Sequence, residues 1–181
     1  TPNCAKIIAS ILFVIEEGER RGSAITQYDI VKTLWDADVE HLNTYGRPIT
    51  FDNYAAMEHG PVPSLVYEML MPEYRWPDVN RSRAPWLARE AGTALNYGIG
   101  DERADLRVLS KSDRNVLLKA FDRVLKDGFW KTRERTHQHP AWRAAWEKRG
   151  LAKSRAIDYA LLLEAPDREM VEHLAYASAH A

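Results

Sequence analysis

The sequence has almost no cysteine and no long hydrophobic run. Its single cysteine, Cys4, excludes a disulfide within the chain and a zinc site built from several thiolates. The longest apolar run, residues 7–15, is interrupted at Ala9 and Ser10 and is too short to cross a bilayer. The first residues also lack the basic start and cleavage site of a signal peptide. We therefore expect a soluble, cytoplasmic protein that does not associate with a membrane.

Other absences limit the class of function. Gly98 and Gly100 form only a weak G-x-G pattern, and no strand-loop-helix phosphate cradle follows them. We therefore predict no nucleotide site and no cofactor. No internal repeat, linker or low-complexity block divides the 181 residues, of which 45% are hydrophobic. We expect one domain that spans residues 1–181 and buries a sizeable core.

The charge is nearly balanced overall but unevenly distributed. The formal net charge is −1. Residues 1–80 contain six Lys or Arg and twelve Asp or Glu, whereas residues 101–155 contain fifteen and eight. A basic segment of this kind suits contact with nucleic acid or with an acidic protein. We favour mutual neutralisation of the two segments across the fold, because nucleic-acid-binding domains usually have a basic balance overall.

Hydrophobic periodicity predicts a mainly helical (α+β) fold with about six or seven helices. Two pairs of residues, Thr26 with Asp29 and Ser110 with Asp113, have the spacing of a capping box. Gly128 is expected to break or kink the helix that follows Ser110. The helices are expected to begin at Pro2, Thr26, Ser64, Ser110, Pro140, Ser154 and Pro166. The strands are expected over residues 94–99 and 104–109, as a small antiparallel hairpin that turns at residues 98–102.

Residues 36–64 are the stretch whose residue order is most specific. Asp38, His41 and Tyr45 are spaced to lie along one strip of a helix, and Gly46 is expected to end that helix. Asp38 falls in line with the apolar stripe, so it needs a donor such as His41, a backbone N–H or an arginine. We favour a structural polar cluster over an acid/base pair, because no nucleophile lies close in sequence.

The same stretch ends in a rigid turn and carries a resemblance to a known family. The string D-V-E-H-L-N-T-Y-G-R-P-I-T (residues 38–50), the spaced Tyr54 and Met57, and H-G-P-V-P-S (residues 59–64) resemble the Panacea domain of SocA-like antitoxins. T-H-Q-H-P-A-W at residues 136–142 is similar to that family's second motif. The resemblance extends from the first helix to about Tyr159. It departs in the Pro/Arg/Trp-rich insert at residues 72–86 and in the C-terminal helix at residues 166–181.

The resemblance implies an antitoxin of a bacterial or phage toxin–antitoxin pair. Such a protein is not an enzyme and holds inactive, by direct binding, a protein toxin encoded by an adjacent gene. The residues expected to shape the binding surface are His59, Gly60, Pro61, Pro63, Thr136, His137 and Trp142. In the insert, Arg75 and Trp76 have the residue types that dominate interface hot spots. Tryptophans that fold back over the core are an equally good interpretation of the insert.

Two other functions fit parts of the sequence. A DNA-binding regulator would use the basic residues 101–155 on operator DNA, and a homodimer would suit it as well. A hydrolase would use Asp38, His41, His59 and His137, if these side chains converge in a pocket. The His-x-His pair at His137 and His139 lacks further ligands nearby, so we predict no metal site. Thr136 or His139 is instead expected to cap the helix that begins at Pro140.

Overall fold

The structure is a computed structural model that describes residues 1–77, 80–165 and 167–179. Its helices are α1 (Cys4–Arg20), α2 (Gln27–Tyr45), α3 (Ser64–Leu70), α4 (Lys111–His137), α5 (Pro140–Glu147), the 3-10 helix η1 (Tyr159–Leu162) and α6 (Arg168–Ala179). Its strands are β1 (Ile25–Thr26), β2 (Tyr54–Met57), β3 (Gly60–Pro63), β4 (Trp86–Ala91), β5 (Ala94–Ile99) and β6 (Arg155–Ala156). The predicted fold class, mainly α with a small antiparallel β component, is confirmed.

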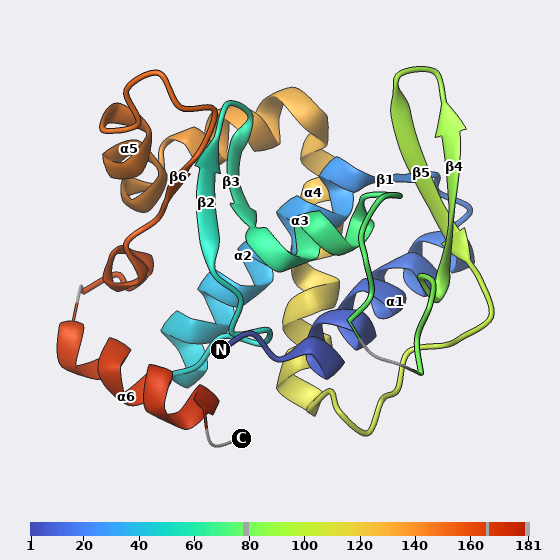
Figure 1. Ribbon diagram of the computed structural model, residues 1–181, viewed down its shortest axis with the longest axis horizontal. Coiled ribbons are helices and arrows are strands. Elements are labelled where there is room, and N and C mark those ends of the chain that lie inside the picture. The colour runs from blue at the N-terminus through green and yellow to red at the C-terminus, as the bar shows by residue number, and fades with distance from the viewer. Residues whose placement is uncertain (78–79, 166, 180–181) are drawn as a thin grey trace.

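Helix α2 runs through the middle of the fold and packs against α1, α3 and α4 (Figure 1). Every residue from Ile30 to Trp35 on it is buried, so this part of the helix is covered on all sides. Its start and end match the prediction. Thr26 and Asp29 form a reciprocal capping box, and Gly46 ends the helix in the left-handed conformation with φ of 80°.

The strands form two small antiparallel sheets, with orders β1-β5-β4 and β3-β2-β6. The predicted hairpin was wrong in its partner, because β5 pairs with β4 and residues 104–109 form no strand. Ala91 pairs with Ala94, which leaves Gly92 and Thr93 as a two-residue loop. The first position of such a loop requires a positive φ, which glycine adopts at low cost. Gly92 has φ of 64° there.

The helix predicted from Ser154 to Glu164 is also wrong. Residues 155–156 instead form β6 on the edge of β2, and the backbone N–H of Ile157 donates to the backbone oxygen of Tyr54 at 2.9 Å. Asp158 then caps the short helix η1 by accepting from the N–H of Ala160. The backbone groups of residues 155–157 thus find hydrogen-bond partners on the edge of β2, which replaces the predicted helix. The C-terminal helix is present from Arg168, whereas its predicted start at Pro166 lies outside the described residues.

Ion pairs connect the acidic first half of the chain with the basic helix α4. Lys119 Nζ lies 2.6 Å from a carboxylate oxygen of Glu40, and an Arg135 guanidinium nitrogen lies 2.6 Å from one of Asp36. In the other direction, Lys6 of α1 lies 2.9 Å from Asp113 of α4. The two oppositely charged segments neutralise each other at these contacts, as the sequence analysis favoured. Within the described ranges, no helix combines the length and the apolar character needed to cross a membrane.

Candidate partner-binding cleft

The two sequence motifs lie against each other in the fold. The indole Nε1 of Trp142 donates a hydrogen bond to the backbone oxygen of Met57 at 2.9 Å. Gly60 has φ of 110°, in the range that favours glycine, and a Cβ atom there would lie 2.7 Å from Thr136 Oγ1. The turn between β2 and β3 therefore passes directly over the end of α4. Segments almost eighty residues apart form one junction.

A buried lysine supports this turn from below. Lys32 of α2 is 1% exposed, and its Nζ donates to the backbone oxygen of Pro61 at 2.6 Å. A Cβ atom on Gly60 would lie 2.7 Å from the same Nζ. Burial lowers the pKa of the Lys32 ammonium to about 7, and the negative charge of Asp36 offsets only part of this effect. Lys32 is not predicted from the sequence, because no local pattern reveals a lysine whose burial depends on a distant turn.

A cleft of about 660 Å³ opens beside the junction. Its lining comes from α2, the β2–β3 hairpin, α3, the end of α5 and the chain that follows α5. Its apolar lining includes Val31, Val62 and Tyr67, and His59 of the turn lines it as well. Trp146, Arg149 and Lys153 complete the part of the lining that follows the second motif. Of the predicted surface residues, His59 and Gly60 line this cleft, whereas Pro61 and Pro63 are buried in β3 beneath it.

Two aromatic residues at the kink of α4 extend the rim of the cleft. Gly128 interrupts the helix with φ of 71°, as predicted. The Phe129 ring then lies 4.5 Å from the ring of Tyr28 and 5.4 Å from that of His59, both of which line the cleft. Trp130 is 75% exposed. These aromatics were missed, although a glycine followed by two aromatics inside a basic helical segment could have revealed them.

The pKa of Lys32 gives a prediction about stability. In the unfolded chain a lysine has a pKa near 10.5, so between pH 7 and that value the unfolded state binds more protons than the folded one. Stability should therefore rise from pH 7 to pH 9, by about 2 kcal/mol, which is still below the range in which tyrosines ionise. Urea unfolding at the two pH values measures this gain. Lys32→Met should remove most of it and Lys119→Met, at an exposed site, should keep it; equal gains in both variants would refute the assignment.

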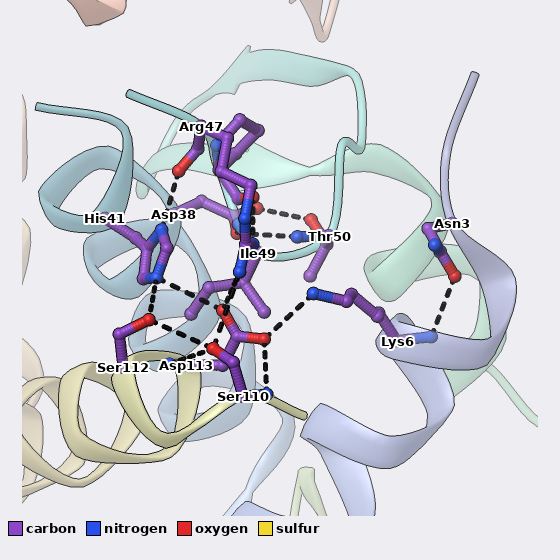
Figure 2. Close-up of polar contacts among 11 residues, drawn as sticks. Asn3, Lys6, Asp38, His41, Arg47, Ile49, Thr50, Ser110, Ser112 and Asp113 are labelled. Atoms are coloured by element: carbon purple, nitrogen blue, oxygen red, sulfur yellow. Dashed lines mark hydrogen bonds and ion pairs between the residues drawn. The ribbon is translucent and has the colours of Figure 1, made fainter. Parts of the chain in front are cut away.

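The predicted polar strip of α2 separates into two clusters (Figure 2). Asp38, 1% exposed, accepts hydrogen bonds from the backbone N–H groups of Ile49 and Thr50 at 2.9 and 3.0 Å. It also accepts from the hydroxyl of Thr50 and, at 2.5 Å, from that of Tyr54. Burial raises the pKa of the Asp38 carboxyl, and the four donors oppose this. The expected backbone donors are present, whereas His41 is not a partner of Asp38.

His41 belongs to the second cluster, which joins α2 to the start of α4. Its Nδ1 lies 2.7 Å from the backbone oxygen of Arg47, and its Nε2 lies 2.9 Å from Ser112 Oγ and 3.2 Å from Asp113. Serine and aspartate therefore share one ring nitrogen, unlike a catalytic triad, in which they occupy opposite nitrogens. Burial lowers the pKa of His41. Tyr45, whose ring lies 4.6 Å from that of His41, is more than half exposed.

The insert places its aromatic residues on the core. Trp86 is 4% exposed, and the ring of Trp76 packs against it with the centroids 5.8 Å apart. Of the two interpretations left open, the structure shows the one in which the tryptophans fold back over the core. Arg75 is exposed. Neither Arg75 nor Trp76 lines the cleft.

The four residues of the alternative hydrolase do not converge. Asp38 and His41 lie in the two separate clusters, His59 lies on the cleft, and the His137 ring stacks on Trp142 with centroids 3.9 Å apart. In the part of the chain that the structure describes, no three His, Cys, Asp or Glu side chains are placed to hold a metal ion. His139 instead caps α5, as predicted, by accepting from the N–H of Ala141.

Comparison with known proteins agrees with the resemblance inferred from the two motifs. A family model described as "Antitoxin SocA-like, Panacea domain" matches residues 30–143. The matched range runs from α2 to α5 and so includes the junction and most of the cleft, but ends before Trp146 and Arg149. No curated protein and no solved structure gives a match.

Proposed function

Because the chain belongs to the SocA-like antitoxin family and carries its Panacea domain, we propose that it neutralises a protein toxin by binding to it directly. The toxin would be the product of an adjacent gene, and the complex would form in the cytoplasm. Neutralisation requires a preorganised surface that buries on the order of 1,200–2,000 Å² and covers or locks the working part of the toxin.

The observation that carries this proposal is the cleft at the junction of the two family motifs. Phe129 lies against the lining residues Tyr28 and His59, exposed Trp130 packs on Phe129, and Trp146 in the lining has the Arg149 guanidinium 3.6 Å above its ring. Tryptophan, tyrosine and arginine are the residues that contribute most to binding at protein interfaces. In this proposal Gly60, Thr136 and Trp142 hold the cleft in shape, and the rim contacts the toxin.

The other two functions have less support. The hydrolase requires a converged set of side chains, and its four residues lie apart. The DNA-binding regulator requires free cations along one exposed helix. Four of the eight Lys and Arg side chains on α4 have acidic partners: Lys119 pairs with Glu40, and Asp127 lies within 4.0 Å of Arg123, Lys131 and Arg135. Operator DNA and a homodimer stay predictions from the sequence.

Co-expression tests the proposed function. We expect the adjacent gene to stop growth when expressed alone, and growth to recover when this chain is expressed with it. The two proteins should then co-purify as a complex of fixed stoichiometry. A neighbour that is harmless alone, or one that is neutralised without any complex, would contradict the proposal.

A further inference from the structure

Three cations at the cleft have no acidic partner among the described residues. Arg149 and Lys153 line the cleft, and Arg133 reaches its rim by donating from Nε to His59 Nδ1 at 3.2 Å. Among the described residues, no carboxylate lies within ion-pair distance of these three side chains. Glu58 is the one acidic residue that lines the cleft within the described ranges. A protein with a net charge of −1 thus gathers unpaired positive charge at this site.

The cleft is also large enough, and apolar enough, to hold an apolar side chain beside a charged group. Its volume of about 660 Å³ is within the range that holds a few side chains. Val31, Val62 and Tyr67 supply apolar surface. Leu151, which lies between Arg149 and Lys153 in the sequence, is fully exposed. The complementary occupant has a bulky apolar side chain with carboxylates beside it.

We propose that the cleft captures an acidic segment of the toxin, in which an apolar side chain enters the cleft and neighbouring carboxylates pair with Arg149, Lys153 and Arg133. This inference rests on the proposed function and adds the chemistry of the partner. The cationic side at residues 149–153 lies outside the residues that match the family, 30–143. The matched part therefore builds much of the cleft and contains Arg133, and the following segment adds the other two cations, with which this chain would select its own toxin.

A nucleic acid is a poorer occupant of this cleft. A nucleic-acid backbone needs an extended row of free cations. The neighbouring basic hollow on α4 does not continue such a row, because Asp122 and Asp127 lie in it among Lys126 and Lys131. A concave site of limited length with an apolar surface fits a protein segment better.

The test uses the purified product of the adjacent gene as the probe and measures its Kd for the full chain. Arg149→Glu combined with Lys153→Glu should raise the Kd by about 100-fold, because two attractive contacts become repulsive. Lys153→Glu alone should raise it by about 10-fold, and this side chain makes no contact that the fold needs. Arg143→Glu combined with Lys148→Glu changes the charge equally outside the cleft and should alter the Kd by less than about 3-fold. The difference in Kd between the wild type and the cleft variants should diminish as the salt concentration rises, since exposed charges are screened.

A photo-crosslinking amino acid in place of Ala152, which lines the cleft, identifies the occupant. Mass spectrometry should locate the crosslink in a toxin peptide rich in Asp and Glu, and the same amino acid in place of Leu87 on β4 should give none. A crosslink to a basic or neutral peptide would overturn the inference. Equal Kd values for the cleft and control variants would also overturn it, while leaving the proposed function intact. If the neighbouring protein neither stops growth nor binds the chain, both the inference and the proposed function are overturned. If nucleic acid co-purifies with the wild type but not with the cleft variant, the occupant of the cleft is nucleic acid and the inference is overturned.

Discussion

Replacing Asp38 by alanine is expected to lower the free energy of unfolding by about 4 kcal/mol, which for a protein of this size threatens folding altogether. The carboxylate satisfies two backbone N–H groups and two hydroxyls in the interior, and alanine leaves all four without an acceptor. The backbone groups belong to Ile49 and Thr50, so the segment that connects α2 to β2 would lose these attachments to the helix and keep the one between His41 and Arg47. Denaturant unfolding of the purified variant measures the loss.

Glu40→Ala is the matched control for this prediction. Glu40 is also a carboxylate on α2, but it is partly exposed and pairs with the exposed Lys119. Its removal should cost less than about 1 kcal/mol. If Asp38→Ala unfolded as easily as Glu40→Ala, the buried carboxylate would not be the support of this segment. Tyr54→Phe, which removes one of the four donors and leaves the carboxylate, should fall between them.

Replacing Gly60 by alanine is expected to destabilise the protein by about 3 kcal/mol and to abolish binding of the toxin. Its φ of 110° is strained for any residue with a Cβ atom. The new atom would also lie 2.7 Å from Lys32 Nζ and from Thr136 Oγ1, so the turn or these side chains would have to shift. We expect the turn to move, because both side chains are buried and Lys32 Nζ is hydrogen-bonded to the backbone oxygen of Pro61. That movement displaces His59 and opens the cleft. Unfolding in denaturant and co-purification with the neighbouring protein measure the two effects.

Gly92→Ala separates backbone strain from crowding. Gly92 also has positive φ, 64°, but no heavy atom lies within 4 Å of a Cβ placed there. It lies in the β4–β5 loop, away from the cleft. Its replacement should cost about 1 kcal/mol and leave toxin binding unchanged. Equal losses of stability in Gly92→Ala and Gly60→Ala would mean that crowding against Lys32 and Thr136 contributes nothing to the effect of Gly60→Ala.

The sequence predicted those elements whose signals are local. The capping boxes at Thr26 and Ser110, the stop at Gly46 and the kink at Gly128 each depend on residues within one or two helical turns, and all four are present. Helix α3 also begins where predicted, at Ser64. Such features need no knowledge of the rest of the chain, because the backbone groups they satisfy lie next to them.

The wrong predictions depended on partners far away in sequence. The apolar spacing at residues 154–164 suited a helix, but residues 155–156 lie on the edge of β2, a strand one hundred residues earlier. The hairpin was centred on Gly98 and Gly100, whereas Gly98 pairs with Leu87 inside a strand. A short strand is defined by the neighbour with which it pairs, and residue pattern alone does not identify that neighbour.

The site was predicted in part for the same reason. The motifs at residues 59–64 and 136–142 were recognised, and the structure brings them together. Lys32 and Arg149 were missed, because their importance comes from lying around one cleft and not from their own neighbours in sequence. Asp38 and His41 were singled out as a pair, and each found its partners on other elements.

The central claim, that this chain neutralises a toxin by forming a complex with it, is tested most directly by titrating one protein against the other in cells. With the adjacent gene induced at a fixed level and this chain at increasing levels, growth should recover as the chain reaches the ratio found in the purified complex. The account predicts this sharp dependence for the wild type and its loss in Gly60→Ala. Growth that recovers far below that ratio, or without any complex, would contradict direct binding as the mechanism.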